Sequence, residues 1–280
     1  MAIVLALLCA SAYGTGDFFG GLATRRVGSA FAVVFGSQVV SLAFVIVVVP
    51  LFGGHPHPAD MAWAAGGGVA GAVGLVSFYR ALAIGPMSIT APVSAVIAAV
   101  VPVLVGIVSG ERPGTRALVG IPVAVVAIVL FSSSPATEAH HVRPTLASLL
   151  FAALAGVGFG TFFVFLAQVR REAELYPLLA SRGASIGAVA LVALASGRSL
   201  AVRRANWRLV GLAGVFDIAA NGFFLLASGR GLLSIVSVLA SLYPAGTVIL
   251  ARVVLHERLT RRHAVASVVT AMAVVLIASG

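Results

Sequence analysis

Long apolar runs separated by short polar breaks follow one another along the whole chain. Most runs hold about 20 residues, the length at which a helix rising about 1.5 Å per residue crosses about 30 Å of hydrocarbon. The runs and their Gly, Pro and charged breaks predict about ten transmembrane helices, at residues 2–23, 30–52, 61–83, 88–109, 116–133, 146–169, 176–196, 207–227, 232–255 and 263–278. We therefore expect an all-α membrane protein.

The chain also aligns on itself without a gap at an offset of 146 residues. This offset gives 26 identities in 134 aligned pairs, whereas shared composition alone would give roughly a tenth of positions. Polar pairs are the most informative, because apolar residues match easily by chance. They include Thr15 with Thr161, Ser88 with Ser234, Glu111 with Glu257 and Arg116 with Arg262.

The repeat predicts two five-helix units, residues 1–134 and 146–280, joined by a loop over residues 135–145. An odd number of spans leaves the chain on the opposite side of the membrane, so the second unit enters it upside down. Inverted repeats of this kind recur in secondary transporters, where one half rocks against the other around a central site.

Composition supports a membrane location, since 60% of the residues are hydrophobic, 9% are charged and the mean hydropathy is +1.12. The net charge of +10 comes from 18 arginines that lie mostly in the breaks, as loop residues that set topology do. No basic polar surface for nucleic acid is expected. With span-end residues counted, the arginines favour termini outside the cytoplasm.

Each repeat has an acidic–basic pair after a helix that contains proline: Glu111-Arg112 follows Pro102, and Glu257-Arg258 follows Pro244. This signature, with the opening run Ala-Tyr-Gly-Thr-Gly-Asp at residues 12–17, resembles the EamA repeat of the drug/metabolite transporter superfamily. The first-helix motif of that family usually has tryptophan where Tyr13 stands, and the second repeat has Ala266 in place of a late glycine.

The resemblance covers nearly the whole chain. It implies a ten-helix bundle with a central cavity lined chiefly by the first, third, fourth, sixth, eighth and ninth helices. It also implies export or uptake of small metabolites, amino acids or drugs, often driven by an ion gradient. No ATP-binding motif of the GxxxxGK[ST] type occurs in the sequence.

Asp17 is the first candidate for cargo or proton binding, because an ionisable group inside a span is costly to keep. It follows Tyr13 by four residues, so a carboxylate and a phenol would share one helical face. A carboxylate in such a place can take up and release a proton near neutral pH. The alternative is that Asp17 lies near the interface and only solvates the helix end.

Asp217 and Asn221 lie one turn apart in the eighth predicted span, where they would face protein or water rather than lipid. Their alternative role is an interhelical hydrogen bond. Arg182 in the seventh span would be a counter-ion for a buried carboxylate, with Asp217 as one partner, or would attract an anionic substrate. Snorkelling of Arg182 to the membrane surface is slightly favoured.

Two further groups complete the candidates. Aromatic and hydroxyl side chains that could line the cavity are Tyr79, Tyr243, Ser237 and Ser241, although tyrosine near a span end is often an interfacial anchor. Structural roles beside a following helix start are expected for Glu111, Arg112, Glu257 and Arg258.

The sequence thus predicts a secondary transporter rather than an enzyme, since neither HExxH nor GxSxG occurs. A membrane-embedded scaffold or sensor without transport activity is the alternative. We expect a multi-pass protein of the bacterial plasma membrane, as monomer or homodimer, whose partners are a small-molecule substrate and the lipid bilayer. No cofactor is expected. No metal site is expected either, because Cys9 is the single cysteine and four histidines lie in loops.

Overall fold

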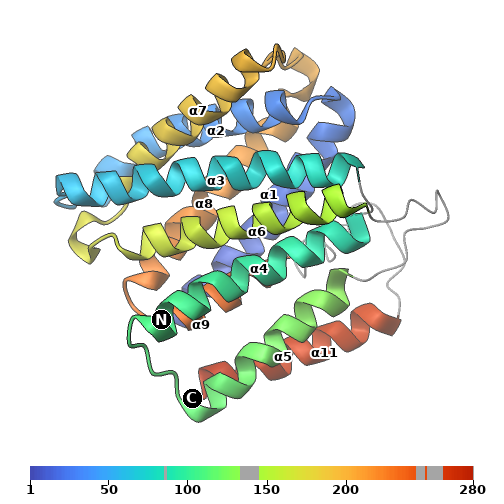
Figure 1. Cartoon of the computed structure of the whole chain (residues 1–280). Helices are drawn as coiled ribbons and strands as arrows, with labels where there is room; N and C mark the ends of the chain where they lie inside the picture. The colour runs from blue at the N-terminus through green and yellow to red at the C-terminus, as the bar shows by residue number, and fades with distance from the viewer. Residues whose placement is uncertain (85–86, 133–144, 244–249, 251–260, 280) are drawn as a thin grey trace.

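The computed structural model describes residues 1–84, 87–132, 145–243, 250 and 261–279. Helices and connecting segments make up these residues, and no strand occurs among them. The α-helices are α1 (Ala2–Val27), α2 (Ala30–Val48), α3 (Pro58–Ile84), α4 (Met87–Val108), α5 (Thr115–Ser132), α6 (Leu146–Ala167), α7 (Pro177–Ala195), α8 (Trp207–Ser228), α9 (Leu233–Ala240) and α11 (Arg261–Ala278) (Figure 1). Three 3-10 turns, η1 (Val49–Leu51), η2 (Arg171–Ala173) and η3 (Arg204–Asn206), stand in the loops.

Local sequence signals set several helix ends. Gly28 adopts the left-handed conformation (φ 74°) that stops α1, and its N–H reaches the Thr24 carbonyl at 2.9 Å. Ser29 then caps α2 by accepting from the Ala32 N–H. Thr145 and Ser148 form a reciprocal capping box at the start of α6. The helices therefore begin and end close to where the breaks in the apolar runs predicted.

In the part of the chain that the structure describes, six helical segments are long and apolar enough to cross a membrane: Ala2–Thr24, Ala30–Leu51, Pro58–Phe78, Leu146–Ala167, Pro177–Ala195 and Arg204–Ser228. Shorter apolar helices cover Val93–Val108, Thr115–Leu130 and Val268–Ile277. Large apolar side chains such as Val47, Leu191 and Leu194 are exposed on the outside of the bundle. A water-soluble protein rarely leaves so many uncovered, whereas lipid tails cover them in a bilayer. The chain is a multi-pass membrane protein.

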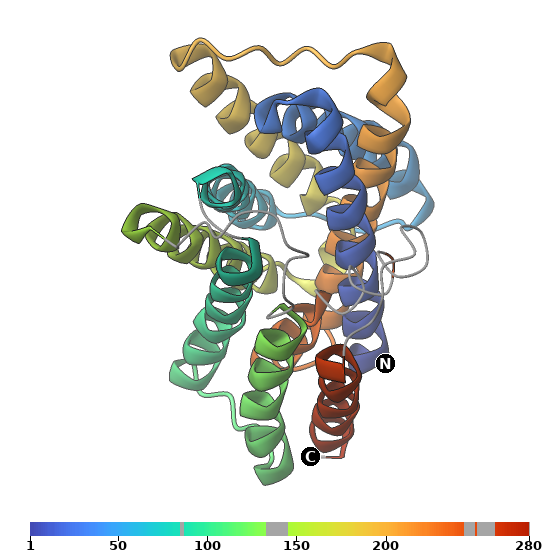
Figure 2. The same cartoon turned by 90° about the vertical axis from the view of Figure 1, so that its right-hand side faces the viewer.

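Helices from the two halves of the chain interleave in space. In Figure 1, α3 runs beside α6, and α1 packs along α8. The 146-residue offset relates α1 to α6 and α3 to α8, so these two pairs are equivalent to each other. Helices α5 and α11 lie side by side in both views and reach the other helices chiefly through α4 and α9 (Figures 1 and 2). This arrangement fits an architecture of two repeats.

Two equivalent glycines allow close helix crossings. A Cβ on Gly68 of α3 would overlap the carbonyl oxygen of Ser181 in α7, and one on Gly214 of α8 would overlap that of Ser37 in α2. Gly68 and Gly214 are paired by the 146-residue offset. Because glycine is the only residue that fits at either crossing, the duplication in sequence is also a duplication in packing.

The loops at one end of the bundle connect the two halves of the chain. We call this end the terminal side, because residues 1 and 279 lie there with loops 109–114, 168–176 and 229–232 (left in Figure 1). Asp60, at the start of α3, is buried and accepts from the Arg170 backbone N–H at 3.1 Å and from Arg170 Nη2 at 2.9 Å. His55 adds a backbone hydrogen bond to Glu172. The Asp60 carboxylate raises the pKa of Arg170 above its ordinary value, chiefly through the side-chain hydrogen bond.

Glu111 makes a second link on the terminal side. The sequence predicted that it would serve the start of the following helix, α5. Its carboxylate instead accepts from the Ser234 N–H at 2.9 Å and from the Leu233 N–H, both at the start of α9 in the other half. Free N–H groups and the helix dipole favour a carboxylate at that position. Arg112 beside it is exposed, and Glu257 and Arg258 lie outside the described residues.

Candidate functional site

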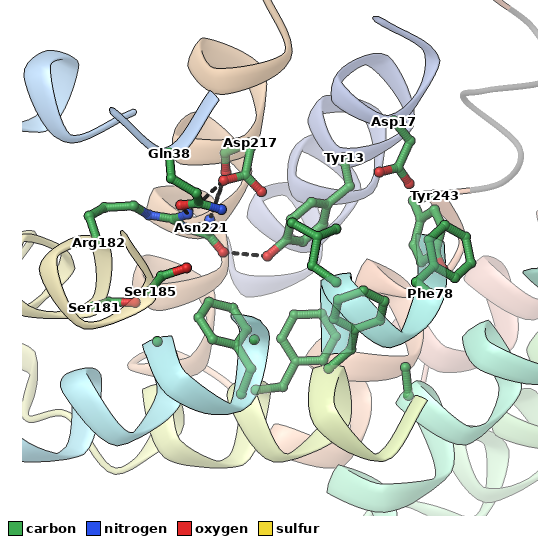
Figure 3. A pocket seen from close by; sticks show the side chains of 17 residues that line it. Tyr13, Asp17, Gln38, Phe78, Ser181, Arg182, Ser185, Asp217, Asn221 and Tyr243 are labelled. Atoms are coloured by element: carbon green, nitrogen blue, oxygen red, sulfur yellow. Dashed lines mark hydrogen bonds and ion pairs between the residues drawn. The ribbon is translucent and has the colours of Figure 1, made fainter. Parts of the chain in front are cut away.

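A cavity lies midway along the bundle, between helices of both halves. It holds about 750 Å³ of space, including the part open to solvent. Its lining consists of Tyr13, Asp17, Gln38, Gly68, Gly71, Leu75, Phe78, Ala98, Phe159, Phe162, Phe163, Ser181, Arg182, Ser185, Asp217, Asn221 and Tyr243 (Figure 3). These residues come from α1, α2, α3, α4, α6, α7 and α8, with Tyr243 beyond the end of α9. The second and seventh helices thus contribute as well, although they are not among the helices that the family resemblance implied.

Arg182 and Asp217 form an ion pair on one side of this cavity. Arg182 Nη1 lies 2.7 Å from Asp217 Oδ2 and also donates to Gln38 Oε1. The Arg182 side chain is only 4% exposed, so it does not snorkel to the surface as the sequence slightly favoured. A partner inside the bundle explains the difference, because a paired guanidinium can remain buried.

Asn221 extends the pair toward α1. Its Nδ2 donates to the backbone oxygen of Asp217 at 2.8 Å, and its Oδ1 accepts from the phenol of Tyr13. A continuous polar chain thus runs from Gln38 through Arg182, Asp217 and Asn221 to Tyr13 (Figure 3). The chain connects α2, α7, α8 and α1, so helices of both halves share it.

Asp17 lies apart from this polar chain. It lies within the apolar segment Ala2–Thr24, and its side chain is exposed and lines the cavity. It makes neither a hydrogen bond nor an ion pair within the described part of the chain. Asp17 points toward Tyr243 in Figure 3. The cavity therefore has one carboxylate that is already neutralised, at Asp217, and one that is not.

Aromatic rings form much of the remaining wall. The Tyr13 ring lies 6.1 Å from Phe163 and 6.4 Å from Tyr243, measured between centroids. Phe159 packs against Phe78 at 6.0 Å. Such rings suit a flat or partly apolar ligand, and their faces also attract cations.

Some candidates from the sequence do not reach the cavity. Ser237 is buried in α9, where its hydroxyl donates to the Leu233 carbonyl, and Ser241 is buried at the end of that helix. Neither lines the cavity. The side chain of Tyr79 lies outside the described residues.

Sequence reasoning missed Gln38, Ser181 and Ser185 as separate candidates, together with the phenylalanines of the wall. A signal existed for Gln38, since an amide within the apolar run at residues 30–52 needs a partner inside the protein. The phenylalanines carried no signal, because lipid-facing and cavity-facing rings look alike in sequence. Among the described residues, no group of three or more His, Cys, Asp or Glu side chains could hold a metal ion.

The arrangement defines a multi-helix membrane protein with an internal polar site that is built from residues of both halves. Such a site is typical of membrane transporters. Residues 1–133 and 146–279 each match the model of the EamA-like transporter family, and the chain belongs to that family. Its members are transporters of the drug/metabolite type rather than enzymes.

Solved structures share the fold. One crystal structure matches with a TM-score of 0.78 at 19% sequence identity, covering 98% of this chain and 95% of that one. In all, 29 solved chains match. At this identity the likeness supports the fold alone. No curated protein matches the sequence.

Proposed function

We propose that the chain is a secondary transporter that moves a small molecule across the bacterial plasma membrane by alternating access. It would cross the bilayer about ten times, in two inverted five-helix units over residues 1–134 and 146–280. The observation that carries the proposal is the cavity midway along the bundle, lined by residues of both units. A site at the join between inverted halves can be exposed to either side when one half rocks against the other.

Asp17 is the proposed coupling residue. It faces the cavity and has no ion-pair partner among the described residues. An unpaired carboxylate away from bulk water is stabilised by a proton. Asp217 is less suited to this role, because Arg182 at 2.7 Å already stabilises its charged form. Proton gain and loss at Asp17 would thus accompany the movement of cargo.

Counterflow in proteoliposomes tests this function. Vesicles loaded with one candidate metabolite should accumulate its labelled form, and an imposed pH gradient should drive net flux. Asp17→Asn should keep counterflow but lose the pH-driven flux, since an amide cannot carry the proton. Asp17→Glu should retain part of it.

Ser11→Ala is the matched control, because Ser11 lies on the same helix and its hydroxyl donates to the Leu7 carbonyl one turn earlier in that helix. If Asp17→Asn left pH-driven flux of an identified cargo unchanged, Asp17 would not be the coupling group. A scaffold or sensor would show no flux for any cargo tested.

A further inference from the structure

Among the described residues that line the cavity, three side chains carry full charges: Asp17, Arg182 and Asp217. Since Arg182 and Asp217 neutralise each other at 2.7 Å, this set keeps one uncompensated negative charge. We infer that the cargo is a small organic cation: a protonated amine on a flat apolar body, with a neutral hydrogen-bond acceptor at the far end. This inference rests on the proposed function, because it assigns the cargo of the same cavity.

The cationic end of the cargo belongs at Asp17. The other carboxylate among the described lining residues is Asp217, which would repel a negative charge at Asp17 and is itself paired with Arg182. No arginine in the described part of the chain pairs with Asp17. A carboxylate held among helices without a counter-ion is costly, and an ammonium group would relieve that cost. Charge alone therefore favours a cation over an anion at this position.

The rings beside Asp17 favour an organic cation over a metal ion. Tyr13 and Tyr243 lie edge to face, 6.4 Å apart between centroids, next to the carboxylate (Figure 3). Cations bind to ring faces, and the apolar body that carries an amine can pack on the same rings. A metal ion would instead need several oxygen or nitrogen ligands, and no group of three or more His, Cys, Asp or Glu side chains occurs among the described residues.

The far end of the cavity offers unused donors. Arg182 Nε and Ser181 Oγ are buried and have no hydrogen-bond partner in the described part of the chain, and both residues line the cavity. Figure 3 shows Arg182, Ser181 and Ser185 on one side of Tyr13, with Asp17 and Tyr243 on the other. A buried donor without a partner is costly, so a small shift of either side chain toward the cavity would let an acceptor atom of the cargo bind there favourably.

That acceptor should be neutral rather than a carboxylate. Asp217 already occupies Arg182, and a carboxylate from the cargo would lie close to it in a site that carries a net negative charge. Like charges at short range repel strongly away from bulk water. A hydroxyl or carbonyl oxygen would satisfy the same donors without that cost.

Four compounds that share one ring separate these features: tyramine (amine and phenol), phenethylamine (amine alone), tyrosol (hydroxyl in place of the amine) and tyrosine (zwitterion). Calorimetry on the purified full chain in nanodiscs would measure their affinities. Tyramine should bind most tightly. Tyrosol and tyrosine should bind about ten- to a hundredfold more weakly, the ratio expected for loss of a charged hydrogen bond or for added repulsion.

Variants locate the two ends of the cargo. Asp17→Asn should weaken tyramine by about tenfold or more and leave tyrosol unchanged. Ser181→Ala should weaken tyramine toward the affinity of phenethylamine and leave phenethylamine itself unchanged. Ser11→Ala should affect none of the four, because Ser11 lies outside the cavity lining.

The inference is overturned if tyrosine or tyrosol binds as tightly as tyramine, if neither amine binds, or if Asp17→Asn leaves amine affinity intact. Counterflow of a neutral or zwitterionic cargo, without binding of either amine, would support the proposed transport function but reject the inference that the cargo is a cation. Absence of counterflow for every bound compound would reject transport itself.

Discussion

At the scale of single residues, Arg182 depends on Asp217 for its counter-charge. Its side chain is nearly inaccessible, so loss of the carboxylate would leave an uncompensated charge inside the bundle. Removing one partner of a buried pair typically costs about 3–5 kcal/mol. Asp217 is 32% exposed on its side chain, which allows some water to reach the site and brings the expected cost toward the lower end.

We expect Asp217→Ala to lower the apparent melting temperature in detergent by roughly 6–12 °C. The double variant Arg182→Met/Asp217→Leu should recover most of the loss, because no charge is then left unpaired. Asp17→Asn serves as the control and should leave the melting temperature nearly unchanged, since Asp17 has no ion-pair partner in the described part of the chain. Equal losses in the single and double variants would contradict the proposed dependence.

The sequence predicted the character of the site residues better than their partners. Asp17, Asp217 and Asn221 stood out because polar groups are rare in apolar spans. Arg182 stood out too, and the ion pair with Asp217, one of the partners that the sequence offered, is present in the structure. The choice between this pair and snorkelling depends on the packing of α7 against its neighbours, which spacing along one helix does not encode. Ser237 and Ser241 looked equally suitable and lie elsewhere, because periodicity does not tell which side of a buried helix faces a cavity.

At the scale of helices, the apolar runs predicted the positions of the helices well. They predicted less well where a helix with a polar first turn begins. The third span was expected from residue 61, whereas α3 begins at Pro58. Asp60 in its first turn accepts from the His57 N–H and from Arg170 of a distant loop, so local and distant contacts both stabilise a polar first turn that the apolar run did not include. The ninth span was expected over residues 232–255, of which the structure describes α9 and the residues just beyond it.

Helix contact at Gly214 gives a second prediction. A methyl group there would overlap the Ser37 carbonyl oxygen in α2, and backbone cannot move aside cheaply. We expect Gly214→Ala to destabilise the protein by about 1–3 kcal/mol, measured as a lower melting temperature. Gly211→Ala on the same helix is the control, because nothing lies within 4 Å of its added carbon. Equal behaviour of the two variants would show that this crossing is not tight.

At the scale of the whole molecule, the terminal side is held together by Asp60 with Arg170 and by Glu111 with the start of α9. Cys9 is buried one helical turn from Tyr13, between that end of α1 and the cavity. If the halves separate on the terminal side during transport, a path to the cavity from there would pass Cys9. The single cysteine is therefore a native reporter of opening on that side.

We expect Asp60→Asn combined with Glu111→Gln to speed modification of Cys9 by a water-soluble thiol reagent several-fold. Mass spectrometry of reconstituted protein would follow the reaction. Arg203→Gln, in the loop between α7 and α8, should leave the rate unchanged. A rate that does not differ between the double variant and the parent would show that these links do not hold the terminal side closed.

The Asp60–Arg170 link has no charged counterpart in the other repeat. When the two repeats are aligned at the 146-residue offset, Asn206 corresponds to Asp60 and Thr24 corresponds to Arg170. In the proposed alternating-access cycle, two identical halves would give the inward-facing and outward-facing states equal free energies. One unmatched ion pair would make these free energies unequal, so the empty protein would favour one of the two states. Since about half of the Arg170 side chain is in contact with water, dissolved salt would screen this ion pair. The free-energy difference between the two states, and with it their populations in the empty protein, would then depend on salt concentration.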